Sequence, residues 1–425
     1  MSNIPDQYRL NDFWTKKVSL VLLVLGAVAF LLSFLQAINF GVEEKAVSSS
    51  FVSSFFVAAS ENAGHGSPFS RFFHSYLAVY VFFMAIVFGS IFFVILQSLT
   101  RAGWSVLVRR IPEVYSKNVV LMAILALPLV VFGMHDLYHW TDKAAVEHDV
   151  LLQAKEAYLN IPFFYIRIVF YFVALFFIVK IYSDLSQKQD SDGDVAHTLK
   201  MQKYAPVAML AFALIITFFS FDFLMSLMPH WYSTIWGVYY FASSTVVSLS
   251  LFILSFLFLR RLGYLKKEVT VEHYHDLGKL LFAFNVFWSY IAFSQYMLIW
   301  YANIPETTIF YLNRINGQWL SVSIALLVGH IFIPILFYVS RNVKRSFFGQ
   351  LAICLILFFV ELLNMFWIVL PNIDTSGFHV TFSDTLLVLG MAGLFFGLFL
   401  RNLGKVSLVP LKDPRFEESL NFENS

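Results

Sequence analysis

Charged residues are scarce in this chain of 425 residues: only 13% are Asp, Glu, Lys or Arg, whereas 59% are hydrophobic. Soluble proteins carry about 25% charged residues. The 50 phenylalanines exceed what a soluble core of this size can bury, so most of the surface must be apolar and its solvent must be lipid. This composition excludes a cytosolic enzyme, a nucleic-acid-binding protein and a disordered chain.

Cysteine is almost absent, with Cys354 as its single instance. One thiol makes no intrachain disulfide, and it supplies neither the ligands of an iron–sulfur cluster nor a CxxCH haem attachment. We therefore expect this chain to bind no cofactor of its own. If the protein serves redox chemistry, thiolate-held cofactors must lie on partner chains.

Ten apolar runs are long enough to cross a bilayer, for which about 20 residues are needed. The first run is too long for the apolar region of a cleavable signal peptide and has no small-x-small site after it, so we expect it to be retained. The sequence thus predicts an all-α integral membrane protein with a single membrane domain over residues 1–425. The predicted spans are 17–39, 72–99, 118–137, 161–183, 205–228, 236–260, 277–301, 317–340, 347–371 and 384–401.

Lys and Arg residues lie mostly on one side of these spans. The N-terminus, the even-numbered loops and the C-terminal tail carry 23 of them, whereas the odd-numbered loops carry 5. Because cytoplasmic loops are enriched in Lys and Arg, both termini are predicted to be cytoplasmic. On this map, residues 40–71 form an outer loop with an apolar interfacial segment at 51–59. Residues 402–425 form a polar cytoplasmic tail that is expected to lie extended over a partner.

An internal repeat is suggested by the order of the spans. Spans two to five and six to nine each begin on the outer side and contain four helices, which predicts two four-helix bundles plus two peripheral helices. Span five carries Asp222 before a Pro-His-Trp sequence, and span nine carries Glu361 before a Pro-Asn sequence. The two halves would then be related by an axis along the membrane normal.

Ionisable residues inside spans are costly and usually face the interior of the bundle, so each group of them is a candidate site. The first group, His135, Asp136 and His139, lies at the outer end of span three, and its two histidines have the spacing of one helical face. Histidine and aspartate at an outer membrane edge are suited to bind a quinol and to accept its protons. The alternative is an ordinary interfacial belt of His, Tyr and Trp.

The second group lies at the outer end of span five. It contains Asp222 and, nearer the surface, His230, which is a further candidate for a quinol site. Arg167 lies at a similar depth in span four. One interpretation is a structural Asp222–Arg167 ion pair. The other is that Asp222 titrates as part of a proton route.

The third group lies near the middle of the membrane. Glu361 and Asn364 share a face of span nine, and His330 lies at a similar depth in span eight. A lone buried carboxylate can carry a proton, whereas a Glu–His or Glu–Asn hydrogen bond orders the packing. Span seven is the most polar span, and Asn285 and Ser289 on one of its faces indicate a hydrated or closely packed seam.

Two long motifs and the C-terminal tail resemble a known family. The motifs are FDFLMSLMPHWYSTIWGVY at 221–239 and FWSYIAFSQY followed by IWYANIPE within 287–306, and the tail carries KDPR and ESL within 412–420. They are similar to the ActF-type membrane subunit of bacterial alternative complex III, which belongs to the polysulfide-reductase (NrfD-like) family. The resemblance covers essentially all ten spans.

This resemblance implies a quinol:cytochrome c oxidoreductase in the bacterial inner membrane. Its partners would be a sister ten-span subunit, an iron–sulfur subunit, c-type cytochrome subunits, lipids and a terminal oxidase. The iron–sulfur clusters and c-type haems would lie on those partners, and the chain would not be catalytic alone. It would act as a scaffold and proton-conducting subunit, with proton-path candidates Asp222, Glu361, His330, Arg167 and Asn364.

Three other functions stay open on the sequence. The chain binds quinol itself near the periplasmic face, or it works alone as a secondary transporter, or it holds a b-type haem between histidines of facing spans. A transporter is disfavoured because the chain lacks short spans interrupted by Gly or Pro at matching positions of its two halves. Against a haem, His135, His139, His230 and His330 do not form two pairs at matched depths.

Overall fold

The computed structural model describes residues 5–47, 69–375 and 377–424, and this part of the chain is helical, without a strand. Within it, 10 helical segments are long and apolar enough to cross a membrane, which confirms the predicted number. The predicted interfacial segment at 51–59 lies outside the described residues. The first outer loop was predicted to begin at residue 40, but α1 continues to Val47.

The membrane-spanning segments consist of one or more helices each. They are α1 (Ser19–Val47, preceded by a π-helical turn at Phe13–Val18), α3 (Ser70–Leu99), α4 (Val106–Ser116) with α5 (Val119–Val131), α9 (Ile161–Asp192), α10 (Val195–Phe223), α11 (Trp236–Arg261), α12 (Val271–Ala302), α14 (Trp319–Leu327) with the π-helical turns η6 (Val328–Phe332) and η7 (Pro334–Tyr338), α16 (Phe347–Val369) and α17 (Phe382–Leu403). The shorter α-helices are α6 (Met134–Leu137), α7 (Lys143–Glu147), α8 (Val150–Lys155), α13 (Pro305–Ile315), α15 (Arg341–Arg345) and α18 (Phe416–Leu420). Short 3-10 turns lie at Asp6–Tyr8, Gly103–Ser105, His139–Thr141 (η4), Met225–Leu227 and Leu370–Asn372.

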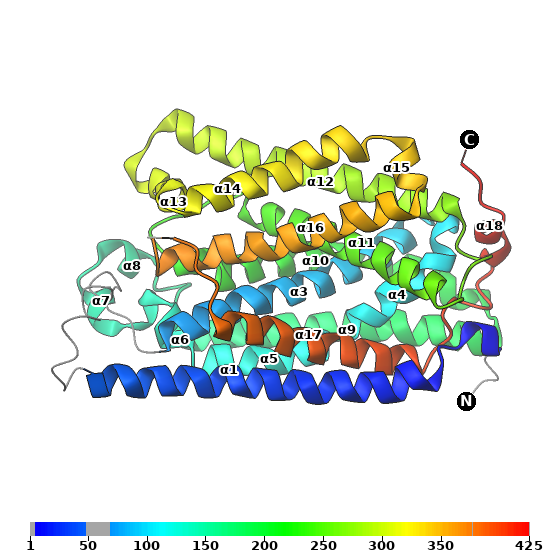
Figure 1. The fold of residues 1–425 in the computed structure, drawn as a ribbon, viewed down its shortest axis with the longest axis horizontal. Helices are drawn as coiled ribbons and strands as arrows, with labels where there is room; N and C mark the ends of the chain where they lie inside the picture. The colour runs from blue at the N-terminus through cyan, green and yellow to red at the C-terminus, as the bar shows by residue number, and fades with distance from the viewer. Residues whose placement is uncertain (1–4, 48–68, 376, 425) are drawn as a thin grey trace.

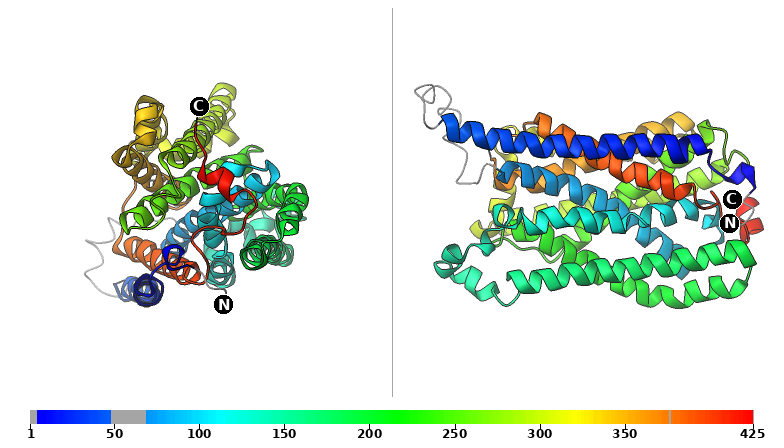
Figure 2. Two further views of the ribbon diagram at one scale, coloured as in Figure 1. Left: turned by 90° about the vertical axis from the view of Figure 1, so that its right-hand side faces the viewer. Right: turned by 90° about the horizontal axis from the view of Figure 1, so that it is seen from below.

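The long helices run along one axis as an elongated bundle, with both termini at the same end (Figure 1). The centre is formed by α3 and α11, which pack against each other and are the two most buried spans. Helices α10 and α16 contact both of them. By contrast, α1 lies at the rim of the bundle and packs chiefly against α17 (Figure 2). The core of the fold therefore lies between the second and sixth spans.

The outward faces of the peripheral helices are apolar. Leu20 and Leu31 of α1 are 59% and 56% exposed, and Val207 and Leu210 of α10 are 72% and 69% exposed. Large aliphatic side chains are stable on such a surface when lipid, rather than water, covers it. Their placement agrees with the composition, which required an apolar surface.

Small residues let α1 and α17 approach each other closely. A Cβ atom added to Gly26 would lie 2.6 Å from the backbone nitrogen of Leu394, and one added to Gly393 would lie 2.7 Å from the Cα atom of Gly26. Such small-residue seams are common where membrane helices pack by van der Waals contact. The seam fixes α1, which otherwise contacts little of the bundle.

The third span differs from its prediction. It was predicted over 118–137 after a basic loop, but the apolar segment runs from Gly103 to Val131 and includes α4. Arg109 and Arg110 of α4 are buried because Glu113 binds both of them at 2.9 Å. Mutual neutralisation lets these charges be buried, so a segment that resembles a loop by composition is a packed helix.

The C-terminal tail was predicted to extend over a partner, but it folds back onto its own chain. Asp413 pairs with Arg109 at 3.0 Å, and the Ser419 hydroxyl donates to the carbonyl of Trp104 at 2.6 Å. Arg415 also donates to the carbonyl of Arg101. The tail thus covers the end of the bundle at which α4 begins.

Candidate functional site

A polar network lies inside the second half of the chain, around Glu361 of α16. This carboxyl group is fully buried, eight residues before Val369, the last residue of α16. Its Oε2 accepts a hydrogen bond from Asn364 Nδ2 at 3.0 Å. Asn364 in turn accepts from the hydroxyl of Tyr239 at 2.7 Å, and its Nδ2 also donates to Ser243 Oγ at 3.1 Å. One oxygen of Glu361 is therefore bound to α11 through Asn364.

The other carboxyl oxygen of Glu361 faces a histidine without a hydrogen bond. Glu361 Oε1 lies 3.7 Å from Nε2 of His330, and both atoms are buried and lack a hydrogen-bond partner among the described residues. A distance of 3.7 Å is beyond a direct hydrogen bond. Buried polar atoms usually have partners, so two orphaned atoms that face each other mark this place as unusual.

His330 is held from behind by a residue of α12. Its Nδ1 lies 2.9 Å from Asn285 Oδ1, and its backbone carbonyl accepts from Asn285 Nδ2 at 2.6 Å. Trp288, one turn further along α12, stacks on the imidazole at 3.8 Å and donates its indole N–H to Ser243. The ring of His330 therefore has a defined orientation, with Nε2 toward Glu361.

A local feature of the sequence explains why the carbonyl of His330 is free to bind Asn285. In an α-helix it would accept from the N–H of the residue four positions later, which is Pro334, and proline has no N–H. The segment forms the π-helical turns η6 and η7 instead, and π-helical turns are frequent at functional sites. Proline four residues after a buried histidine was the signal that sequence reasoning missed.

The structure thus brings together Glu361, Asn364 and His330, the three predicted residues of the mid-membrane group. The polar face of span seven also belongs to this site, through Asn285. Tyr239, Ser243 and Trp288 were not singled out, because a hydroxyl or an indole on a membrane helix is ordinary and only its tertiary contacts give it a role here.

The second predicted group forms a closed ion pair in the first half of the chain. Arg167 of α9 donates from Nε and Nη2 to the two oxygens of Asp222 at 2.9 and 2.8 Å, and Tyr171 donates to Oδ2 at 2.8 Å. Arg167 also donates to the carbonyl of Tyr158 and lies over its ring, 3.9 Å from the centroid. Asp222 is fully buried, and each of its oxygens has a donor. This is the predicted ion pair.

Arg314 of α13 is a buried cation that sequence reasoning placed only in an outer loop. It donates to the carbonyls of Trp367 and Ile368, at 3.0 and 2.7 Å, and to that of Phe310 at 2.7 Å. Among the described residues it has no carboxylate partner. Burial lowers its pKa to about 9, so it stays charged at neutral pH. The negative end of the α16 dipole stabilises this charge.

The first predicted group is not arranged as expected. His135 and His139 were predicted to share one helical face, but α6 ends at Leu137 and Tyr138 is extended, with φ −122° and ψ 109°. Helix α5 ends at Val131 and Gly133 precedes the separate short helix α6, so the two histidines lie on separate turns. His135 instead lies 3.1 Å from the hydroxyl of Thr141.

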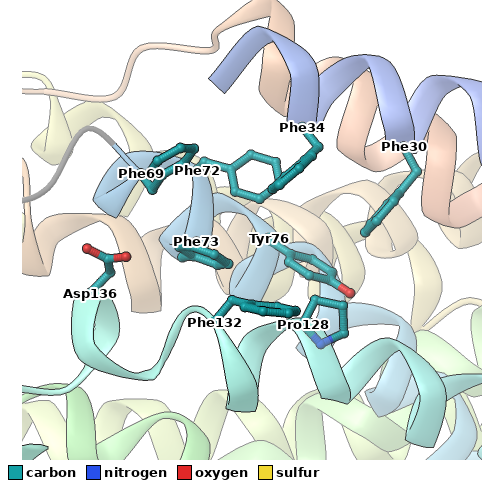
Figure 3. A pocket seen from close by; sticks show the side chains of 9 residues that line it. All are labelled: Phe30, Phe34, Phe69, Phe72, Phe73, Tyr76, Pro128, Phe132 and Asp136. Atoms are coloured by element: carbon teal, nitrogen blue, oxygen red, sulfur yellow. The ribbon is translucent and has the colours of Figure 1, made fainter. Parts of the chain in front are cut away.

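Asp136 alone of this group lines a pocket, which has a volume of about 270 Å³. Aromatic rings form most of its wall, with Phe30 and Phe34 of α1 on one side and Asp136 at one end (Figure 3). Ligand pockets in proteins have volumes of about 300–1,000 Å³, so this one has room for a single ring system. None of the predicted histidines lines it.

His230 lies away from this pocket and pairs with Asp149, in the segment between the third and fourth spans. Desolvation raises the pKa of Asp149, but hydrogen bonds from the backbone N–H of Leu152 and from His230 outweigh it, so the pKa is below its usual value. His230 is more than half exposed. His230 thus pairs with Asp149, whereas His135 lies beside Thr141, so the predicted histidines are not brought together here.

The two motifs that carry the family resemblance lie side by side in space. Ser233 of the first donates to Gln295 of the second at 3.2 Å, and Tyr239 contacts the ring of Trp288. Within the described residues, no group of three or more His, Cys, Asp or Glu side chains is arranged to hold a metal ion. No protein-family model matches the chain, and no curated protein is similar to it.

Proposed function

We propose that this chain is the proton-conducting membrane subunit of a respiratory quinol:cytochrome c oxidoreductase, with Glu361 and His330 as its central proton carrier. The observation that carries the proton part is the pair of orphaned atoms, Glu361 Oε1 and His330 Nε2, which face each other 3.7 Å apart in a buried site. Ionisable groups inside membrane spans are characteristic of proton relays. The assignment to a quinol-oxidising complex is supported by the two sequence motifs, which lie against this network.

The proposal includes an orientation and a location. The end of the bundle that carries both termini, α15 and α18 would be cytoplasmic, because it holds most of the Lys and Arg residues. The membrane would be the bacterial inner membrane, and the two halves would pack as related four-helix bundles. Partner subunits would carry the iron–sulfur clusters and c-type haems.

The roles of the two buried carboxylates differ under this proposal. Asp222 accepts two hydrogen bonds from an arginine and one from Tyr171, so a proton on it would compete with these donors and remove the charge that pairs with Arg167. Glu361 has one oxygen without a partner, so it can gain or lose a proton at that oxygen without breaking a hydrogen bond. Proton transfer is therefore assigned to Glu361, and Asp222 is assigned to assembly.

The test uses the complete complex purified from the native membrane and reconstituted in vesicles. We expect c-type haem and iron–sulfur chains to purify in a fixed ratio to this chain. Glu361→Gln should leave that ratio unchanged and lower quinol-driven proton release per electron. Asp222→Asn should lower the yield of the complex instead. An assembled Glu361→Gln complex with unchanged proton release and membrane potential would refute the role, and a chain that purifies alone would favour a transporter.

A second candidate function is quinol binding in this chain, which the aromatic pocket at Asp136 favours. Its rings suit stacking with a quinone ring, and a carboxylate at its end suits a hydroxyl group. A photoactivatable quinone should then label residues of α1 or α3, and Asp136→Asn should weaken labelling. Label found only on a sister subunit would exclude this candidate.

A further inference from the structure

The hydrogen bonds around His330 determine which of its ring nitrogens carries the hydrogen. A backbone carbonyl only accepts, so the side-chain nitrogen of Asn285 must face the carbonyl of His330, at 2.6 Å. The side-chain oxygen of Asn285 then faces Nδ1, and an amide oxygen only accepts. Nδ1 must therefore donate. In the neutral imidazole, this leaves a lone pair on Nε2, directed at Glu361.

The hydrogen bonds around Glu361 lead to the complementary result. The hydroxyl of Tyr239 donates to the oxygen of Asn364, which turns the nitrogen of Asn364 toward Oε2 of Glu361. Oε2 is thus an acceptor, and Oε1 is left facing Nε2. If Glu361 were ionised and His330 neutral, two lone pairs would face each other 3.7 Å apart, and a negative charge would be buried without a cation.

We propose that Glu361 and His330 hold one proton between Oε1 and Nε2, and that Asn285 is the positioning residue that keeps the His330 lone pair directed at that proton. The pair then has zero net charge in both of its forms, the carboxylic acid with neutral imidazole and the carboxylate with imidazolium. This inference names the carrier state of the proposed proton route and rests on that function only for its biological meaning.

The surroundings contain little else that could supply or compensate a charge at this site. Tyr239 of α11 is a further titratable side chain at this site, and its hydroxyl is bound to Asn364. Arg314 lies toward the outer end and is bound to three carbonyls. From α12, the neutral side chains of Asn285 and Trp288 contact the imidazole. A single shared proton satisfies both orphaned atoms without any further group.

Transfer within the pair needs only a small movement. Donor and acceptor must approach from 3.7 Å to about 2.6–3.2 Å, the range of a direct hydrogen bond. The proton leaves Oε1 and binds Nε2, and the imidazole becomes an imidazolium that still donates from Nδ1 to Asn285. No other bond is formed or broken.

The experiment counts protons in the full-length wild-type chain, isolated in lipid nanodiscs, by two spectroscopies. In the infrared, we expect a protonated carboxylic acid band that shifts in D₂O and disappears in Glu361→Gln but persists in Asp222→Asn, the matched control. In ring-¹⁵N-labelled protein, we expect His330 to show a protonated Nδ1 and an unprotonated Nε2. An imidazolium together with an ionised Glu361 equally counts one proton and supports the proposal.

Two results would overturn it: an ionised Glu361 beside a neutral imidazole, or a protonated Glu361 beside an imidazolium. Asn285→Leu tests the positioning role, because it should move the His330 hydrogen to Nε2 and shift the carboxylic acid band; unchanged spectra would reject that role. If variants do not fold, the wild-type nitrogen spectrum and the infrared band still count the protons. If the pair holds one proton but Glu361→Gln leaves proton release by the complex unchanged, the proposed function is rejected and the shared proton stands.

Discussion

Asp222 of α10, in the first half of the chain, and Glu361 of α16, in the second half, are both fully buried in membrane-spanning helices, but their surroundings differ. Asp222 has a guanidinium and a tyrosine hydroxyl on its two oxygens. Glu361 has an amide on one oxygen and an unbonded histidine nitrogen opposite the other. In the second half the buried arginine, Arg314, binds backbone carbonyls instead of a carboxylate.

Under the proposed function, two buried acidic side chains serve different purposes, Asp222 for stability and Glu361 for proton transfer. A carboxylate in a bidentate pair is held in its charged form and fixes two helices together. A carboxyl group whose nearest arginine is bound elsewhere can exchange a proton with a neighbouring imidazole. The location of the arginine, more than the identity of the acid, separates the two roles.

Removing the arginine of the first half tests this comparison most severely. Arg167→Met leaves Asp222 buried without its cation, and breaking one side of a buried pair costs about 3–5 kcal/mol. We expect a large fall in stability, measured as a lower SDS concentration at which the chain unfolds in micelles. Arg167→Met combined with Asp222→Leu should recover much of the loss. A mild effect of Arg167→Met alone would show that Asp222 is not held by this pair.

Arg314→Met should have the next largest effect. It removes the guanidinium donors to the carbonyls of Phe310, Trp367 and Ile368, each worth about 1.5–3 kcal/mol as a hydrogen bond to a charged group. We expect a total loss of about 2–4 kcal/mol, because Asn372 still donates to the carbonyl of Ile368 and the helix N–H of residue 314 still serves that of Phe310. The same SDS titration measures it, with Arg314→Lys as the charge-retaining control. If the stability loss of the Arg314→Met, Glu361→Gln double variant departed from the sum of the single losses by more than about 0.5 kcal/mol, Arg314 would interact with Glu361 and the comparison would fail.

Much of the fold could be predicted from the sequence because the requirement for long apolar helices acts on each stretch of chain separately. Lipid requires long apolar helices, so the number of spans was predictable from composition and run length. Helix α4 was missed because Glu113 and the distant Asp413 neutralise its arginines, and a distant partner is invisible in a local window. The fold-back of the tail depends on the same contact and was missed for the same reason.

The candidate site was predictable in its members but not in its arrangement. Glu361 and His330 stood out because polar residues are rare in these spans, whereas their approach depends on how η6 packs against α12 and α16. The error at His135 and His139 had a local cause, since α5 ends at Val131 and Gly133 separates it from α6 before the two histidines. Apolar length alone extended that span too far.

A weaker test compares the neutral donors of the two carboxyl groups. Asn364→Leu leaves Glu361 Oε2 and the Tyr239 hydroxyl without partners, so we expect a loss of about 1–3 kcal/mol in the SDS titration. Tyr171→Phe removes one of three donors to Asp222 and should cost about 0.5–1.5 kcal/mol. If Asn364→Leu cost no more than Tyr171→Phe, Glu361 would be held as firmly as Asp222.

The smallest expected effect concerns Asp149, the acidic side chain that pairs with His230 in the segment between the third and fourth spans. Its lowered pKa means that its contribution to stability is present above the unfolded value, about 3.9, and is lost as the pH falls through the lower folded value. Because this pair is exposed, salt should weaken it, unlike the Asp222 pair. Thermal unfolding of wild type and Asp149→Asn should therefore differ slightly at pH 6 and converge as the pH falls below the lowered pKa of Asp149, or in high salt. A difference that survives high salt would place the Asp149 pair with the buried pairs and remove solvent exposure as the distinction between them.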